Sequence, residues 1–385
     1  MARRLVANGH QVDLVTAQRS EGSQRGWFRT EEAGIRVHWL PVPYSNTMSY
    51  ADRLRAFFSF AVQSAGRAAR LESDVIFATS TPLTIALPGV WASRRRKIPM
   101  VFEVRDLWPE LPIAMGALRD PVSRFLARRL ERFAYRNSSH IVALSPGMAA
   151  GVAATGYPAD RITTIPNSCD LELLAPSKEA AQAFRLAHPE LGEGPIVLYA
   201  GTIGHINGVD YLVKVAEAMQ HRNPAVRFVV LGYGVREEQV RHQAEQTGVL
   251  NQNFFMYQRI PKRQMVQVFS AASITTSLFL DLAEMENNSA NKFFDGLAAG
   301  CPVAINYGGW QQELLERNGA GVRLSRNPLA ATEQLAEWLE DADRLIEAGT
   351  AARKLAEEKF SRDHLAVELE KVLVATVNDA VRGSA

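Results

Sequence analysis

The sequence predicts an α/β protein made of two successive domains, each built on a parallel sheet. The length of 385 residues exceeds what one hydrophobic core usually supports. Short apolar runs of strand size alternate with segments of helical period, which is the pattern of βαβ units. The charge also divides along the chain: residues 1–170 hold 22 Lys and Arg against 14 Asp and Glu, and the remainder holds 21 against 27. A basic first half and an acidic second half indicate two domains with different partners.

The bulk composition excludes several classes of protein. Apolar residues make up 47% and charged residues 22%, as in ordinary globular proteins. No apolar run reaches membrane-spanning length, and no signal-peptide pattern is present. Cys169 and Cys301 lie far apart without metal-ligand spacing, which favours a reducing compartment. We therefore expect a cytoplasmic protein without a metal site.

In the first half the chain opens unusually. MARRLVANG (1–9) has the pattern of a helix end, whereas a doubly wound domain normally opens with a strand and a glycine-rich loop. We therefore expect either that the first strand of this domain is missing or that the domain begins unusually with a helix. The strands expected in this half are QVDLVTA, GIRVHWLPV, DVIFATS, PMVFEV and HIVALS, with helices at 50–71, 83–95, 120–136 and 146–154.

The second half shows the same alternation. Between the halves, 165–180 carries two prolines and an Asn-Ser pair, which predicts a linker. The last stretch, 328–381, is rich in Ala, Leu and Glu and predicts helices. The expected strands are PIVLYAG, VRFVVLGYG, NFFMYQRI, ASITTSLF and CPVAINY, with helices at 208–221, 235–247, 262–271, 290–299 and 309–317.

The most informative stretch is NNSANKFFDGLAAGCPVAINYGGW, residues 287–310. Asn288 or Ser289 is expected to cap a helix there, and Gly300 with the proline at 302 is expected to end it. A helix start offers unpaired N–H groups to an anion such as a diphosphate. Lys292 and Asp295 lie three residues apart on one face, which would suit a nucleotide diphosphate and its ribose. The alternative is an ordinary capped helix with a solvent-facing Lys–Asp pair.

Two glycine-containing turns follow expected strands of the same half. Gly201 and Gly204 lie in YAGTIGHINGVDYL, and Gly232 lies in VVLGYG. Neither turn matches the dinucleotide fingerprint G-x-G-x-x-G, which disfavours a dehydrogenase. After the next strand, Arg259 and Lys262 in YQRIPK could neutralise phosphate, or could be surface residues around a turn proline. Because ligands of open α/β sheets gather at the carboxyl ends of strands, the turns together favour a nucleotide site.

In the first half, FEVRDLWPE (102–110) places carboxylates at a strand end. Glu103 or Asp106 could take a proton from an attacking hydroxyl, although so dense a charge cluster could also be a structural set of ion pairs. Three basic segments, at 50–71, 94–97 and 124–136, suit an anionic membrane surface or lipid acceptor. No nucleic-acid motif accompanies them. Solvated arginines on ordinary helices are the alternative reading.

Read jointly, IVALSPGMAAGVAATGYPADRITTIPNSCD, YAGTIG, VVLGYG and NSANKFFDGLAAGCPVAINYGGW resemble the retaining family 4 glycosyltransferases of the GT-B fold. The resemblance covers nearly the whole chain and is nearest to a bacterial branch that builds surface polysaccharides, which includes the N-acetyl-fucosamine transferase of O-antigen assembly. It implies two Rossmann-like domains facing across a cleft, with the boundaries 1–168 and 169–360. It also implies that a final helix, 361–385, crosses back to the first domain.

The resemblance also implies roles for individual residues. Asp295 matches the second acid of the family's paired-glutamate motif and would bind the ribose, whereas Asn287 stands where the first acid is usual. Asn207 lies near the usual phosphate-binding lysine, so that role would pass to Lys292 or Arg259. The residues expected to bind the donor are Gly201, Gly204, Gly232, Arg259, Lys262, Asn287, Asn288, Ser289, Asn291, Lys292 and Asp295, and those expected in catalysis are Glu103 and Asp106.

The function expected from these residues and the resemblance is transfer of a sugar, with no cofactor or metal, from a UDP-sugar to a lipid-linked saccharide. The enzyme would work on the cytoplasmic face of the membrane, in peripheral contact with anionic lipid, and would bind no nucleic acid. Two alternatives remain open: a UDP-N-acetylglucosamine 2-epimerase on the same architecture, and a non-catalytic protein that binds nucleotide sugars.

Overall fold

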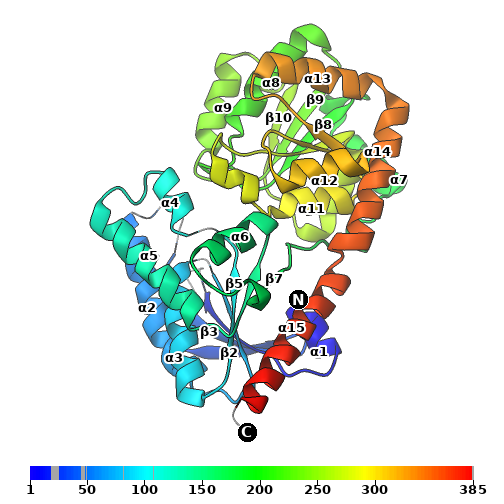
Figure 1. Cartoon of the computed structure of the whole chain (residues 1–385). Helices are drawn as coiled ribbons and strands as arrows, with labels where there is room; N and C mark the ends of the chain where they lie inside the picture. Colours follow the sequence, from blue (N-terminus) through cyan, green and yellow to red (C-terminus); the bar gives the residue numbers. More distant parts are fainter. Residues whose placement is uncertain (19–25, 45–47, 49, 81, 107, 384–385) are drawn as a thin grey trace. The chain divides into compact units, whose positions relative to one another are not determined.

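A computed structural model describes residues 1–18, 26–44, 48, 50–80, 82–106 and 108–383. The chain divides into two compact units, which Figure 1 shows in sequence colours. Unit 1 comprises Met1–Pro166 together with Asp363–Ala385, and unit 2 comprises Asn167–Arg362. The chain therefore passes into unit 2 once and returns to unit 1 for its last helix.

Unit 1 contains a four-stranded parallel sheet in the order β4-β5-β6-β7. Its strands are β4 (Ile76–Thr79), β5 (Met100–Val104), β6 (His140–Ala143) and β7 (Ile162–Thr164). Alternate residues of β5 face opposite sides: Phe102 packs in the cluster formed with α3 and α5, and Val101 packs against α15. The helices named here are α3 (Ala86–Arg96), α5 (Pro121–Arg136) and α15 (Arg362–Arg382). Burial on both faces explains why β5 is almost continuously apolar.

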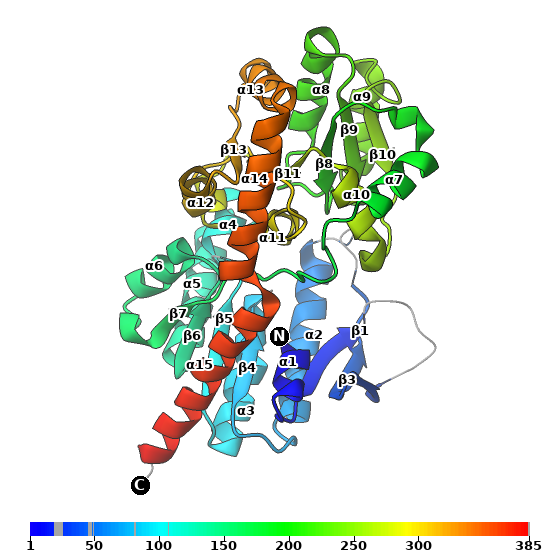
Figure 2. The ribbon, with the colours of Figure 1, turned by 90° about the vertical axis from the view of Figure 1, so that its right-hand side faces the viewer.

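A second, three-stranded sheet of unit 1 has the order β1-β3-β2. β1 is parallel to β3, and β2 is antiparallel to it. The strands are β1 (Asp13–Gln18), β2 (Phe28–Glu32) and β3 (Ile35–Pro41), and the neighbouring helices are α1 (Ala2–Ala7) and α2 (Tyr50–Ala68). The helix predicted at the start of the chain is confirmed as α1, and Figure 2 shows it on the same side of unit 1 as α15.

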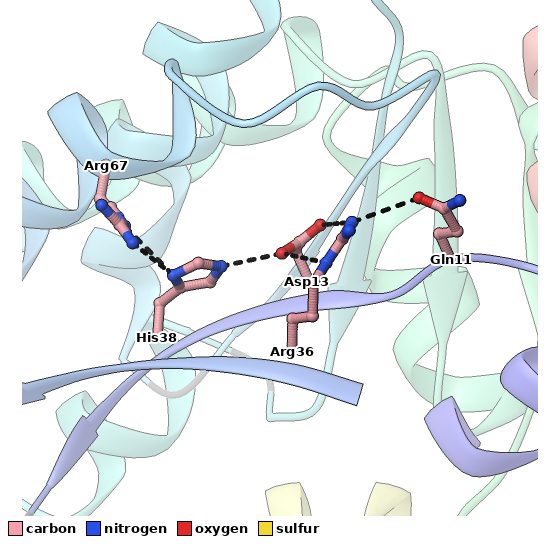
Figure 3. Close-up of polar contacts among 5 residues, drawn as sticks. All are labelled: Gln11, Asp13, Arg36, His38 and Arg67. Atoms are coloured by element: carbon pink, nitrogen blue, oxygen red, sulfur yellow. Dashed lines mark hydrogen bonds and ion pairs between the residues drawn. The ribbon is translucent and has the colours of Figure 1, made fainter. Parts of the chain in front are cut away.

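A buried polar cluster ties α2 to β1 and β3 (Figure 3). His38 is 2% exposed, and its Nδ1 accepts a hydrogen bond from Arg67 Nη2 at 2.7 Å. Because arginine can only donate, the proton of His38 lies on Nε2, which donates to Asp13 Oδ1 at 2.8 Å. Arg36 Nη2 lies 2.5 Å from the other oxygen, Asp13 Oδ2. Burial raises the pKa of Asp13, but the hydrogen bonds from Arg36 and His38 outweigh it, so the pKa lies below its ordinary value.

We expect Asp13→Asn to lower the free energy of unfolding by about 1–3 kcal/mol at pH 7, because buried donors lose a charged acceptor. A carboxyl whose pKa is lower in the folded state than in the unfolded state stabilises the fold at any pH above its unfolded-state pKa. This stabilisation is lost as the pH falls through the folded-state pKa. The difference between wild type and variant in urea unfolding should therefore shrink below about pH 4. Asp52→Asn is the control, because Asp52 pairs with Arg55 on the exposed face of α2. An equal loss in both variants would contradict a special role for the cluster.

Unit 2 is a six-stranded sheet in the order β10-β9-β8-β11-β12-β13, and every neighbouring pair is parallel. The predicted α/β class with two Rossmann-like units is confirmed. The strands are β8 (Ile196–Ala200), β9 (Arg227–Leu231), β10 (Phe254–Tyr257), β11 (Ile274–Ser277), β12 (Val303–Ile305) and β13 (Gly321–Arg323). One layer of helices consists of α8 (Asp210–Arg222), α9 (Glu237–Gln246) and α13 (Pro328–Glu340), which share one apolar cluster. The remaining helices of this unit are α7 (Lys178–Ala187), α10 (Met265–Ala271), α11 (Asn291–Ala298), α12 (Trp310–Asn318) and α14 (Ala342–Leu355).

Several elements are absent from the sequence-based prediction. β2, β7 and β13 were not predicted, and the last two are only three residues long, too short to show a period. Helix α4 (Glu110–Ala114) was also missed. The expected linker 165–180 is shorter than predicted, because Ser177 accepts a hydrogen bond from Ala180 N and so caps α7. Within the described ranges, no helix combines the length and the apolar content that crossing a membrane requires.

Candidate functional site

The sheet of unit 2 has one topological switch point, between its central strands β8 and β11. From β8 the chain continues to β9 on one side, and from β11 it continues to β12 on the other. Ligands of open α/β sheets bind where such loops diverge, at the carboxyl ends of the strands. Here the loops after β8 and β11 meet directly, because Leu280 N donates to Ile206 O at 2.9 Å. Helix α11, which follows β11, begins beside this point.

Lys292 lies in the first turn of α11 and is half-buried. Its Nζ is 4.4 Å from the ring centroid of Phe279 and 5.1 Å from that of Tyr199. Among the described residues its ammonium has no carboxylate within ion-pair distance. Burial lowers the pKa of Lys292 to about 7, since desolvation disfavours the charged form. Two π faces stabilise the cation only partly, so an incoming anion would find a cation with no counter-ion.

Asp295 follows one turn later and is also half-buried. Burial raises its pKa to about 6, and the positive charges of Lys262 and Arg362 oppose that effect. Within the described part of the chain no hydrogen bond to its side chain is formed, and it makes no ion pair with Lys292. The alternative of a Lys–Asp surface pair is therefore wrong. Both charges of α11 are instead left available to a ligand.

The loop ahead of α11 is held differently from the prediction. Asn288 Oδ1 accepts from Ala290 N at 3.1 Å, and the Ser289 hydroxyl accepts from Asn167 N at 3.1 Å. Neither residue caps α11, whose N-cap position is Ala290 with no side-chain hydrogen bond. The expectation of an Asn288 or Ser289 cap is wrong, because the Asn288 side chain bonds within the loop and the Ser289 side chain bonds to Asn167. The helix start remains uncapped by side chains, which leaves its N–H groups for an anion.

The other predicted residues of this loop are less buried than its centre. Asn287 is half-buried and ends a 3₁₀ turn (Ala283–Asn287), and Asn291 is exposed at the first position of α11. The prediction that α11 ends at glycine is confirmed, since Gly300 has φ +61°. Lys292, Asp295 and the loop 287–291 thus come together at one edge of the sheet.

The glycines after β8 and β9 serve loop packing. A Cβ on Gly232 would lie 1.9 Å from the backbone oxygen of Gly201. A Cβ on Gly201 would meet Lys292 Cδ at 3.6 Å, an ordinary contact. Gly204 N donates to Asn207 Oδ1 at 3.1 Å, so the buried Asn207 side chain closes the turn. The absence of a side chain at Gly232 therefore allows a close contact between the two loops.

We expect Gly232→Ala to reduce the free energy of unfolding by about 1–3 kcal/mol, because the added methyl meets backbone that no rotamer change can move. Gly201 would shift with it and carry the change to Lys292. Thermal unfolding followed by circular dichroism measures the effect. Gly66→Ala in α2 is the control, since nothing lies within 4 Å of its added Cβ and alanine favours a helix. Unchanged stability in the Gly232 variant would contradict the tight contact.

Arg259 and Lys262 lie beyond the end of β10 and are exposed. The guanidinium of Arg259 lies 5.5 Å from the ring centroid of Tyr233, and Lys262 Nζ lies 3.4 Å from Asp170 Oδ2. Asp170 also accepts from Arg362 Nε at 2.7 Å. Lys262 therefore belongs to a small charged cluster whose field acts on Asp295.

The two candidate catalytic carboxylates belong to unit 1. Glu103, in β5, accepts hydrogen bonds from the Thr79 hydroxyl and from Arg105 Nη1, the latter at 3.3 Å. Asp106 follows β5, and its backbone oxygen accepts from Trp108 N at 3.0 Å. Leu107, which separates Asp106 from Trp108, lies outside the described residues. The structure thus places Glu103 in a local ion-pair cluster of unit 1.

Sequence reasoning missed the aromatic residues around Lys292. Tyr199 is fully buried near the end of β8, and its hydroxyl donates to Thr202 O at 2.6 Å. Phe279 lies just after β11. In the sequence, Tyr199 and Phe279 appear only as apolar residues of predicted strands. A strand pattern does not show that their rings lie beside the ammonium of Lys292. Across the described ranges, no group of three His, Cys, Asp or Glu side chains is arranged to hold a metal ion.

Comparison with known proteins identifies the family of the chain. A family model described as "Glycosyl transferase 4-like domain" matches residues 1–168, and one described as "Glycosyl transferases group 1" matches residues 181–355. The chain is 23% identical over 324 residues to the GDP-mannose-dependent alpha-(1-6)-phosphatidylinositol monomannoside mannosyltransferase of Mycobacterium tuberculosis. The aligned region covers 76% of this chain and 82% of that relative.

Two solved structures share the fold. The Anabaena HepE protein in complex with UDP and glucose has a TM-score of 0.70 at 16% identity, covering 89% of this chain and 87% of that one. WaaG, a glycosyltransferase involved in lipopolysaccharide biosynthesis, has a TM-score of 0.68 at 15% identity, covering 96% and 94%. The two family models together match most of the chain, and its two units have the architecture of these enzymes. This chain therefore belongs to the group 1 glycosyltransferases of the GT-B fold.

Proposed function

We propose that this glycosyltransferase moves an N-acetylated hexosamine or deoxyhexosamine from a UDP-sugar to a lipid-linked saccharide, with retention of configuration, in surface-polysaccharide synthesis. The observation that carries the donor assignment is the pair of half-buried charges on α11. Lys292 and Asp295 lie at the switch point of the sheet, and neither has an ion-pair partner among the described residues. A diphosphate and a ribose supply the two complementary groups.

The chemistry assigned to the site is stabilisation of a leaving group. When the bond between the anomeric carbon and the diphosphate oxygen breaks, negative charge develops on the diphosphate. The uncapped start of α11 and the Lys292 ammonium would bind that charge, and a fixed electrostatic environment of this kind is a large term in catalysis. Asp295 would accept hydrogen bonds from the ribose hydroxyls and set the position of the nucleotide. Asp106 and Glu103 of unit 1 are the candidates for accepting the proton of the acceptor hydroxyl.

The choice of UDP and of a lipid-linked acceptor has separate support. The Anabaena neighbour was solved with UDP and glucose, and WaaG is described as an enzyme of lipopolysaccharide biosynthesis. The mycobacterial relative is named for GDP-mannose and a phosphatidylinositol monomannoside, which is a glycolipid. Two of these names concern glycolipids, and the nucleotide is UDP in the Anabaena structure and GDP in the mycobacterial name. The nucleotide is therefore the first property to measure.

A panel of UDP- and GDP-sugars tested for protection against thermal unfolding would identify the donor, because a ligand that binds only the folded state stabilises it by mass action. We expect the largest shift with a UDP-N-acetylhexosamine. Release of UDP only when a lipid-linked saccharide is added would support transfer. Formation of an epimer without any acceptor would establish an epimerase, and binding without turnover on any acceptor would support a binding protein.

A further inference from the structure

The outer face of α5 carries a stripe of exposed side chains that is apolar at one end and cationic at the other. Its members follow one another at helical spacing: Val122, Phe125, Arg129, Arg132 and Arg136. Val122, Phe125 and the adjacent Leu126 are 66%, 59% and 58% exposed. The opposite face packs into the core through Ala134 and Tyr135. An exposed aromatic and aliphatic cluster of this size on a helix that already has a packed face indicates a binding surface.

The cations of this stripe form no ion pair with any described residue, although the charges of Arg128 and Arg132 act on Glu131. α5 has one acid of its own, Glu131, which is buried, and the N-cap Asp120 accepts a hydrogen bond from Ser123 N. Arg128, Arg129, Arg132 and Arg136 are exposed, and none of them forms an ion pair with any described residue. Arg129 instead lies 5.8 Å from the ring centroid of Phe125. The surface therefore offers an uncompensated positive charge.

Helix α3 extends this basic surface. Arg94 Nη2 donates to Asn137 Oδ1 at 2.6 Å, which joins the last turn of α3 to the end of α5. α3 and α5 contact each other on the same face of the β4–β7 sheet (Figure 1). The run Arg94–Lys97 is exposed and likewise has no ion pair within the described residues. We name the set Val122, Phe125, Leu126, Arg128, Arg129, Arg132, Arg136 and 94–97 the α5 surface.

Two exposed arginines of unit 2 illustrate the paired arrangement. On α12, Arg317 pairs with Glu313 at 3.1 Å. On α8, Arg222 binds Glu333 and Glu340 at 3.0 and 2.7 Å. Carboxylates of α12 and of α13 neutralise these two arginines, whereas no ion pair neutralises the arginines of the α5 surface among the described residues.

We propose that the α5 surface docks on an anionic lipid bilayer. The apolar first turns of α5 would enter the boundary between headgroups and acyl chains, and the arginines of the later turns would reach lipid phosphates. A second copy of the chain is a poor occupant, because it would bring two cationic surfaces together. A nucleic acid could use the arginines but has no place for exposed Val122 and Leu126. The proposal goes beyond the donor site and does not depend on it.

Co-sedimentation of the full chain with vesicles tests the docking. We expect binding to vesicles that contain phosphatidylglycerol and little binding to pure phosphatidylcholine, with the bound fraction falling as salt rises. Arg132→Ala should reduce the partition coefficient about fivefold, as expected for one cation at an anionic surface. Phe125→Ser should reduce it by about tenfold or more, because a buried aromatic side chain is lost. Both sites are exposed, and circular dichroism confirms that the variants fold.

Matched controls come from unit 2. Leu186→Ser removes a side chain that is 76% exposed on α7, and Arg317→Ala removes a paired cation; neither should change vesicle binding. Lys292→Met should keep wild-type vesicle binding even where donor binding is lost, so the two proposals can fail separately.

Equal binding to neutral vesicles, or equal losses in the controls, would overturn the proposal. A dimer in sedimentation velocity that Phe125→Ser abolishes would assign the surface to a second copy, and RNA binding that competes with vesicles would assign it to nucleic acid.

Discussion

Replacing Lys292 with methionine is expected to weaken binding of the donor nucleotide about 10- to 100-fold, the usual effect of losing a hydrogen bond to a charged group. Turnover should fall by about 10²–10³, because the ammonium acts on the charge that develops on the leaving diphosphate. Methionine removes the ammonium beside Phe279 and Tyr199 but keeps an unbranched, flexible side chain at the position. Isothermal titration with UDP and initial rates with the donor measure the two effects.

The same change should stabilise the unliganded protein. The pKa of Lys292 falls to about 7 in the folded state, so between about pH 7 and 10 the unfolded chain binds more protons and wild-type stability rises with pH. Below pH 7 the full cost of burying the cation remains, and Lys292→Met should raise the free energy of unfolding there by up to about 4 kcal/mol. Lys214→Met on the exposed face of α8 is the control. A variant that binds UDP as wild type does would refute the site.

Donor affinity should also depend on pH through Lys292. Above about pH 7 the unliganded side chain is neutral, and an anion that binds the ammonium must draw a proton from solution. The affinity of the wild type for UDP is therefore expected to fall by up to about tenfold per pH unit above that value. Titrations in buffers of different ionisation enthalpy would detect the proton uptake, and Lys292→Met should show none.

Asp295→Ala is expected to weaken binding of UDP by about 1–3 kcal/mol, because the ribose hydroxyls lose a charged acceptor. A double-mutant cycle with 2′,3′-dideoxyuridine diphosphate makes the test specific. If Asp295 binds those hydroxyls, wild type should lose affinity for the dideoxy ligand, and the variant should bind the two ligands equally. Asp343→Ala on α14, where the side chain is exposed, should retain full discrimination. Unaltered discrimination in Asp295→Ala would place the ribose elsewhere.

The pH dependence of this contact has the opposite sign to that of Lys292. Burial raises the folded-state pKa of Asp295 to about 6, so the folded chain binds more protons than the unfolded chain between about pH 4 and 6. Over that window the stability of the unliganded protein contributed by Asp295 falls as the pH rises. Donor affinity should fall below about pH 6, where the carboxylate becomes protonated. With Lys292, this predicts an affinity maximum between about pH 6 and 7.

The sequence anticipated most of unit 2, because its signals are local. Strands such as IVLYA are buried on both faces and read as continuous apolar runs, and the glycine at 300 ended α11 where expected. Three-residue strands such as β13 were invisible, since their pairing depends on a neighbouring strand and not on their own pattern. The start of α7 was placed inside the predicted linker, because a serine in a sequence does not by itself show that it caps a helix, as Ser177 does here.

The chemical types at the site were also readable from the sequence, but their partners were not. Lys292 and Asp295 share a helix face by spacing alone, which suggested a mutual pair. In the fold, Lys292 lies against two rings contributed by β8 and by the loop after β11, and Asp295 lies in the field of Lys262 and Arg362. Which groups a charged side chain meets depends on residues distant in sequence.

By itself, the sequence determined the α/β class, the order of most elements and the approximate start and end of α11, because periodicity, glycine placement and residue type act over a few neighbouring residues. Only the tertiary structure decided that α11 carries no side-chain cap, that its two charges do not pair, and that Gly232 serves a contact between loops. It also decided that Arg128, Arg129, Arg132 and Arg136 of α5 form no ion pair within the described residues. These properties depend on burial and on contacts between elements far apart in the chain. Both arise only when the helices pack against the sheets.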